Sequence, residues 1–111
     1  MQVQGLLGRD LRAIERALQC IALEIKDRDP KSYDTFMQRA VRVGLFYYSD
    51  QFTIGQLTFE MLKDGYDEKY HTFAVRRVEG LSGLYERQEF RKIRPAFNAF
   101  VDQYIAVYGN E

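Results

Sequence analysis

Cysteine and histidine chemistry is the first possibility to weigh, because the chain has one residue of each kind, Cys20 and His71. A thiol and an imidazole brought together by folding could form a nucleophilic pair. Cys20, however, lies beside a regular series of apolar residues, where a buried and unreactive thiol is the usual role. One cysteine and one histidine are also too few for a structural zinc site, which takes four such ligands. We therefore expect no enzymatic activity, no metal and no cofactor.

The strongest chemical signal in the chain is a basic segment that runs from residue 69 to residue 94. It holds seven lysine or arginine residues and three acidic residues, although the whole chain has a formal net charge of zero. The segment is therefore positively charged and the remainder negatively charged, and a local field of this kind attracts an oppositely charged partner. Its basic residues are Lys69, Arg76, Arg77, Arg87, Arg91, Lys92 and Arg94.

Two tyrosines, Tyr70 and Tyr85, lie within the same segment. Arginine and tyrosine are among the residues most enriched where proteins bind proteins. We expect these two tyrosines and the seven basic residues to form one outward-facing docking surface for an acidic protein partner. The main functional prediction is therefore a small, non-enzymatic regulatory or inhibitory protein that acts by protein–protein contact.

The alternative prediction is a DNA-binding transcriptional regulator of the winged-helix type. A helix over residues 54–63, a turn around Gly65 and a helix over residues 67–81 have the order of a helix-turn-helix. In that arrangement the second helix enters the major groove of double-stranded DNA, and a wing within residues 79–92 contacts phosphates. The local positive charge suits DNA, whereas a sequence pI of about 6.6 is low for a DNA-binding domain.

The first element that must position these residues is a helix near the N-terminus. Apolar residues recur there at alternating intervals of four and three, which places them along one side of a helix. This row either packs in the core of a helical bundle, which we favour, or forms the contact of a homodimer. The row that would carry self-association is Leu7, Leu11, Ile14, Leu18 and Ile21.

Two further helices have recognisable starts. The pair Asp29-Pro30 is typical of the first residues of a helix, and helical spacing of apolar residues follows it. Thr53 and Gln56 match a capping box, in which the side chains of both residues satisfy backbone N–H groups at a helix N-terminus. We therefore expect a second helix after Pro30 and a third helix over residues 54–63.

The last third of the chain is less regular. Residues 67–81 have helical spacing but also contain strand-favouring side chains, so a fourth helix there is the less secure assignment. Residues 79–92, which include Gly80, could form a loop, a helix end or a short β-hairpin. A fifth helix begins near Pro95, carries an apolar face and ends at Gly109.

Together these elements predict an all-α fold, with a single domain over residues 1–111 built as a compact bundle of about five helices. The N-terminal residues lack the pattern of a secretory signal, and the longest apolar run, residues 43–48, is too short to span a membrane. A single cysteine fits a reducing compartment. We therefore expect a cytoplasmic protein that does not enter a membrane.

Overall fold

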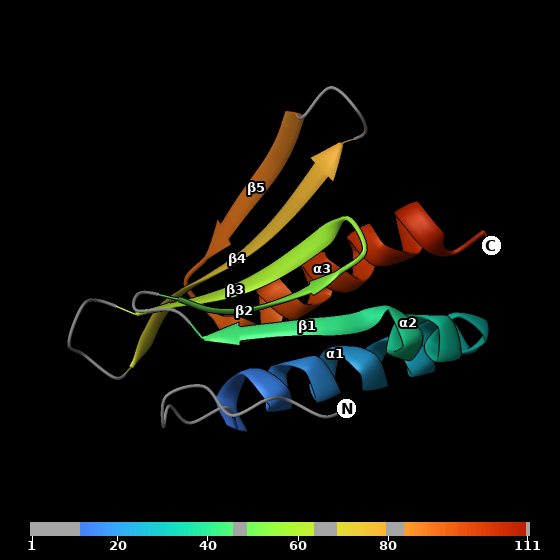
Figure 1. Cartoon of the computed structure of the whole chain (residues 1–111), viewed down its shortest axis with the longest axis horizontal. Helices are drawn as coiled ribbons and strands as arrows, with labels where there is room; N and C mark the ends of the chain where they lie inside the picture. Colours follow the sequence, from blue (N-terminus) through green and yellow to red (C-terminus); the bar gives the residue numbers. More distant parts are fainter. Residues whose placement is uncertain (1–11, 46–48, 64–68, 80–83, 111) are drawn as a thin grey trace.

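The computed structural model describes residues 12–45, 49–63, 69–79 and 84–110, with the backbone alone described at residues 12, 41–45, 79, 84 and 85. Within these ranges, three α-helices, one short 3-10 helix and five β-strands form an α+β fold (Figure 1). In chain order the elements are α1 (Arg12–Arg28), η1 (Pro30–Ser32), α2 (Tyr33–Arg39), β1 (Ala40–Leu45), β2 (Ser49–Ile54), β3 (Leu57–Lys63), β4 (Tyr70–Glu79), β5 (Leu84–Phe90) and α3 (Ile93–Tyr108).

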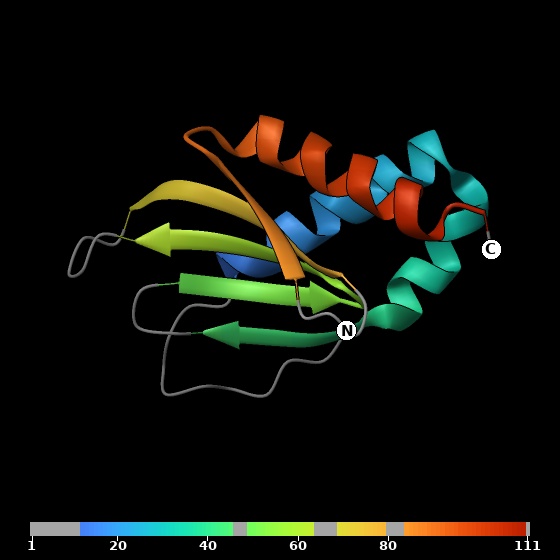
Figure 2. The ribbon, with the colours of Figure 1, turned by 90° about the horizontal axis from the view of Figure 1, so that it is seen from above.

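The five strands form one antiparallel sheet in which each strand pairs with the next along the chain, in the order β1-β2-β3-β4-β5. Helices α1 and α3 pack on each other and against one side of the sheet, and α2 leads directly into β1 (Figure 1, Figure 2). In the described part of the chain, no helix is long and apolar enough to cross a membrane.

Phenylalanine rings fill the space between the sheet and α3. Phe52 on β2 and Phe59 on β3 lie opposite each other, with their ring centroids 5.4 Å apart. Phe100 of α3 meets both rings edge-on, and Phe97 of α3 packs against Phe59. All four rings are buried. Aromatic contacts of this kind add stability beyond the burial of apolar area, so this cluster fixes α3 on β2 and β3.

The two terminal helices that the sequence predicts are confirmed. On α1, the described part of the expected apolar row lies in the core, and Ile14, Ile21 and Ile25 are fully buried. Helix α3 begins two residues before Pro95 and ends immediately before Gly109. Both helices are long enough for the 3.6-residue period of their apolar residues to be unambiguous.

The prediction of an all-α bundle of about five helices is wrong, because the middle of the chain forms a sheet. The second helix begins at Pro30 as a 3-10 turn and ends as α2 at Arg39, and the residues from Ala40 onward continue as a strand. Tyr70–Glu79 is a strand and not part of a fourth helix. The strand-favouring side chains noted within residues 67–81 agree with this structure.

The apparent capping box is part of a β-hairpin. Strands β2 and β3 pair up to Ile54 and Leu57, so that only Gly55 and Gln56 connect them. Gly55 has a φ of 60°, as the first central residue of a type II′ turn requires. Thr53 pairs with Thr58 across this hairpin. The third helix predicted over residues 54–63 is therefore replaced by a turn and a strand.

Residues 79–92 include β5, which forms a hairpin with β4. This hairpin is longer than the predicted wing and is part of the five-stranded sheet. Strands β4 and β5 pair from Phe73 with Phe90 to Glu79 with Leu84, and β4 also pairs with β3. The β4–β5 hairpin is thus the outer part of the sheet, as Figure 1 shows.

The C-terminal end of α3 holds the turn between β2 and β3 in place. The hydroxyl of Tyr108 accepts a hydrogen bond of 3.0 Å from the backbone N–H of Gln56. The guanidinium of Arg39 lies 4.0 Å from the centroid of the Tyr108 ring, and it donates a 2.9 Å hydrogen bond to the hydroxyl of Tyr104. A methyl group on Gly55 would overlap the Tyr108 hydroxyl, because its carbon would lie 2.2 Å from the oxygen.

Candidate binding face of the sheet

The side of the sheet that faces away from α1 and α3 carries mainly polar residues. Side chains alternate between the two sides of a strand, and Phe52, Phe59 and Val75 mark the side that meets the helices. Their strand neighbours therefore belong to the other side, which we call the open face. Its described side chains on β2 to β5 include Gln51, Thr53, Thr58, Glu60, Thr72, Ala74, Arg76, Val78, Arg87 and Glu89.

The pairing register arranges the centre of the open face in two parallel rows. One row runs across four strands as Thr53, Thr58, Arg76 and Arg87. The hydroxyl oxygens of the two threonines are 3.1 Å apart, at hydrogen-bond distance. The neighbouring row runs as Gln51, Glu60, Ala74 and Glu89. A hydroxyl and guanidinium row thus lies beside a row that contains two carboxylates.

Arg76 and Arg87 are directly opposite each other on β4 and β5. Like charges in this arrangement destabilise a sheet. Each arginine has an acidic neighbour: the Nε of Arg76 is 3.6 Å from Oε1 of Glu60, and Nη1 of Arg87 is 2.5 Å from Oε1 of Glu89. The first separation is too long for a hydrogen bond, and the Nε of Arg76 is buried with no hydrogen-bond acceptor in the described structure.

Several side chains of the open face on β3 and β4 are shielded from solvent, whereas its side chains on β5 are exposed. Thr58, Glu60 and Thr72 are buried, at 6%, 8% and 4% exposure. Arg87 and Glu89 are exposed, and 37% of the Arg76 side chain is accessible. The guanidinium groups of the open face are therefore more accessible than the hydroxyls of Thr58 and Thr72.

A second hydroxyl site lies toward the start of β4. The hydroxyl of Thr72 accepts a 3.2 Å hydrogen bond from Nη1 of Arg91, which follows β5. The same hydroxyl is 2.7 Å from Nδ1 of His71. Because Arg91 donates to the hydroxyl oxygen of Thr72, the Thr72 side chain links Arg91 to His71. Arg91 thereby extends the row of cationic groups on this side of the sheet.

The structure brings some of the predicted basic residues together and separates others. Arg76 and Arg87 are neighbours on the open face, and Arg91 contacts Thr72 of that face. Arg77 lies on the opposite side of the sheet, where Nη1 donates a 3.0 Å hydrogen bond to Gln103 of α3. Two others belong to the start of α3: exposed Lys92 is the residue before the helix, and exposed Arg94 lies in its first turn, 5.6 Å from the ring centroid of Phe97.

Tyr70 belongs to a different cluster, at the edge of the core. Its hydroxyl donates a short hydrogen bond to Oδ2 of Asp50, which is 1% exposed. The ammonium of Lys63 is 3.6 Å from the same oxygen and 5.0 Å from the Tyr70 ring centroid. These three residues join the ends of β2, β3 and β4. Lys69 is exposed and immediately precedes β4, and the side chain of Tyr85 lies outside the described part of the structure.

The row of residues predicted to mediate self-association is mostly inside the protein. Ile14, Leu18 and Ile21 are at most 2% exposed and belong to the core beneath the sheet. Leu7 and Leu11 lie outside the described residues. A second copy could reach the three buried residues only if α1 left the sheet, so self-association through this row stays a prediction that the fold does not favour.

The helix-turn-helix arrangement is not present. Its first helix corresponds to the turn after Ile54 and to strand β3, and its second helix corresponds to β4. Gly65, the expected turn residue, lies outside the described residues. Since the proposed recognition element is a central strand of a sheet, it cannot enter a major groove as a helix does.

The chemistry of the described side chains gives no catalytic constellation. Cys20, expected to be buried, is exposed on α1, whereas the imidazole of His71 contacts Thr72 on β4. Among the described residues, no three His, Cys, Asp or Glu side chains come together in a way that could hold a metal ion.

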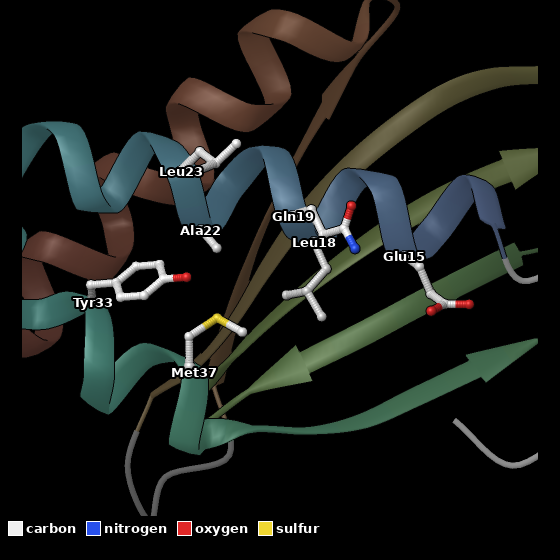
Figure 3. A pocket seen from close by; sticks show the side chains of 7 residues that line it. All are labelled: Glu15, Leu18, Gln19, Ala22, Leu23, Tyr33 and Met37. Carbon is white, nitrogen blue, oxygen red and sulfur yellow. The ribbon is translucent and has the colours of Figure 1, made fainter. Parts of the chain in front are cut away.

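A pocket lies between α1 and α2. It is a pocket of about 290 Å³, lined mostly by apolar side chains, and Figure 3 shows Tyr33 and Met37 of α2 facing α1 across it. Leu23, at its rim, is 62% exposed. The pocket offers one carboxylate, Glu15, and one amide, Gln19, and its lining lacks the guanidinium groups that the open face carries.

The polar residues of the open face were missed by the sequence reasoning. Thr58, Glu60 and Thr72 were not identified as site residues, although polar and apolar residues alternate from Gln51 to Ile54 and from Leu57 to Met61, a pattern typical of a half-buried strand. That alternation was the available signal.

The chain matches no protein-family model, and no curated protein and no solved structure matches it significantly.

Proposed function

We propose that the protein is a small regulatory or inhibitory protein that acts by contact and not by catalysis. It binds an acidic segment of a partner protein on the open face of its sheet, with Arg76 and Arg87 at the centre of the contact. The basic segment that the sequence singles out supplies this surface, although through a smaller set of residues than its full length.

The observation that carries this proposal is the direct opposition of Arg76 and Arg87 on adjacent strands. Two opposed guanidinium groups are unfavourable in the free protein. A carboxylate placed between them would replace that repulsion with charge-assisted hydrogen bonds, which are stronger than bonds between neutral groups. The pair therefore has a physical reason to accept an anionic group.

The acidic residues of the open face do not prevent such binding. The Arg87–Glu89 pair is on the exposed rim, with 29% and 55% of the two side chains accessible. Exposed ion pairs of this kind contribute between 0 and about 1 kcal/mol. A partner carboxylate can therefore exchange with Glu89 at little cost, whereas Glu60 remains as a neighbour of Arg76, with its Oε1 3.6 Å from Nε.

The proposal is tested by the binding of a fluorescent decapeptide rich in glutamate, measured by fluorescence polarisation. Binding should weaken by more than about tenfold in the Arg76→Glu/Arg87→Glu variant, since each reversal replaces an attraction with a repulsion. The matched control is Lys92→Glu/Arg94→Glu, which makes the same change in net charge at the start of α3. The control should bind the peptide with an affinity close to that of the unmodified protein.

Three results would contradict the proposal. One is the absence of peptide binding at low salt. Another is an equal loss of binding in both double variants, which would show that net charge and not the open face determines affinity. The third is preferential binding of a random-sequence DNA duplex that depends on Arg76 and Arg87, because the partner would then be a nucleic acid.

A further inference from the structure

The charges of the open face alternate in sign along β4 and β5, which run side by side at one end of the sheet (Figure 1). The first position holds the opposed pair Arg76 and Arg87. Two residues further along β5, Glu89 is exposed and lies opposite Ala74, which is fully buried. Two residues beyond Glu89, Arg91 is exposed and is hydrogen-bonded to a threonine of β4. This charged strip therefore presents a positive, a negative and a positive position in turn.

The three positions of the charged strip are evenly spaced. Alternate residues on one side of a strand are about 7 Å apart, so the two outer positions are about 13 Å apart. The pair Phe73–Phe90 ends the ladder between β4 and β5, and Arg91 donates to Thr72, the next residue of β4. That hydrogen bond keeps Arg91 in step with β4 although it follows the strand. A partner chain in extended conformation has the same rise per residue, so its residues i, i+2 and i+4 match the three positions.

Binding of an acidic segment changes the surroundings of Glu89. In the free protein, its Oε1 is 2.5 Å from Nη1 of Arg87. A partner carboxylate that takes this place on Arg87 separates Glu89 from its cation. The Glu60 carboxylate belongs to the same row, on the other side of Ala74. A second partner carboxylate above Ala74 would be repelled by both glutamates, whereas a cation there would be attracted. The middle position therefore favours a basic residue of the partner.

We propose that the partner segment is an extended chain with an acidic residue at i, a basic residue at i+2 and an acidic residue at i+4, and that it lies along β4 and β5. Residue i contacts Arg76 and Arg87, residue i+2 contacts Glu89, and residue i+4 contacts Arg91. This inference rests on the proposed function, to which it adds the conformation and the charge order of the partner. The pattern reads the same from both ends, so either chain direction satisfies it.

The first test compares two decapeptides, one with the pattern Glu-x-Lys-x-Glu and one with Glu-x-Glu-x-Glu, in which all other residues are serine. Fluorescence polarisation gives their dissociation constants at about 0.1 M salt, where charges more than about 10 Å apart are largely screened. The ratio of the two constants is the readout, because net charge alters each of them alone. Glu89→Lys reverses the middle position and should shift this ratio by about fivefold toward the glutamate-centred peptide.

The matched control for Glu89→Lys is Glu86→Lys. Glu86 is also exposed on β5, and its replacement makes the same change in net charge. It pairs, however, with Arg77, whose side chain is hydrogen-bonded to α3 on the other side of the sheet. The ratio of the two dissociation constants should therefore change by less than about twofold in Glu86→Lys, because residue 86 points away from the open face.

The second test concerns the third position of the strip. The unmodified protein should bind Glu-x-Lys-x-Glu about two- to fivefold more tightly than Glu-x-Lys-x-Ser, because only the first peptide offers a carboxylate to Arg91. Arg91→Glu should abolish this preference. Lys92→Glu makes the same change at the next residue, which precedes α3, and should preserve the preference.

Three results would overturn the proposed charge order. One is a ratio that shifts equally in Glu89→Lys and Glu86→Lys, or in neither variant. Another is a preference for the third-position glutamate that survives Arg91→Glu. The third is tighter binding of the pattern Glu-x-x-x-Lys-x-x-x-Glu, which would indicate a helical partner. If the glutamate-rich decapeptide still bound through Arg76 and Arg87, the proposed function would stand without this charge order, whereas the loss of that binding would remove both proposals.

Discussion

Replacement of Gly55 by alanine should destabilise the protein through two separate effects. The first is conformational, because the residue has a φ of 60° and an L-residue with a side chain is strained there by about 1–2 kcal/mol. The second is steric: the new methyl carbon would lie 2.2 Å from the hydroxyl oxygen and 2.9 Å from Cζ of Tyr108. Because atoms that are not bonded to each other cannot approach so closely, the Tyr108 side chain must move.

Movement of the Tyr108 ring removes two contacts. Its hydroxyl loses the 3.0 Å hydrogen bond from the N–H of Gln56, which contributes about 0.5–1.5 kcal/mol. The ring also moves away from the Arg39 guanidinium, now 4.0 Å from its centroid, a contact of about 0.5–1 kcal/mol. Together with the strain, Gly55→Ala should lower the free energy of unfolding by about 3 kcal/mol.

Urea unfolding followed by circular dichroism measures this change, and a double-mutant cycle separates its two parts. In a Tyr108→Ala background, Gly55→Ala should cost only the conformational strain of about 1–2 kcal/mol. Gln56→Ala, which changes an exposed side chain in the same turn, is the control and should stay within about 0.5 kcal/mol of the unmodified protein. A cost for Gly55→Ala that is unaffected by removal of Tyr108 would refute the steric argument.

Three further predictions concern the rest of the fold. Ile14→Asp places a carboxylate at a fully buried position and should cost more than about 4 kcal/mol; a thermal scan that shows a native Tm would contradict the assignment of α1 to the core. Asp50→Asn removes the negative charge beside Lys63, whose side chain is 16% exposed, and should cost about 3 kcal/mol in urea unfolding, whereas a change below 1 kcal/mol would show that water compensates this charge. Arg28→Ala breaks a 2.7 Å ion pair with Asp102 that is partly exposed, so it should cost less than about 1 kcal/mol, and a larger loss would mean that the pair fixes α1 on α3.

The helices at the two ends of the chain were predictable because their apolar residues follow a single period over four turns or more. Along α1, no strand-like alternation competes with that period, and Ile14, Leu18 and Ile21 are buried as their spacing indicates. Along α3, Phe97 and Phe100 behave in the same way. Long periodic segments of this kind specify both the element and its buried face.

The strands were not predicted because short apolar runs fit either period. Ile54, Leu57 and Met61 have the spacing of a helical face, yet they lie on the buried side of β2 and β3. The deciding residue is Gly55, which permits a two-residue turn that the capping interpretation of Thr53 did not consider. A hairpin reverses the chain, so residues on either side of the turn share a face through pairing and not through helical spacing.

The candidate site could be predicted only in part for the same reason. The positive charge around Arg76 and Arg87 is visible in the sequence, but their opposition depends on the register of β4 and β5. Arg77 follows Arg76 directly and yet faces α3, because successive residues of a strand point to opposite sides. The row of hydroxyl and guanidinium groups that begins at Thr53 arises from pairing across four strands, which no local pattern specifies.

Amide chemical-shift changes in the ¹⁵N-labelled protein, titrated with the unlabelled glutamate-rich decapeptide, test the proposed binding face most directly. Binding to the open face predicts that the largest changes occur at Thr58, Glu60, Ala74, Arg76 and Arg87, on β3, β4 and β5. Changes confined to α1 and α2, or the absence of changes at saturating peptide, would contradict the assignment of the open face as the binding surface.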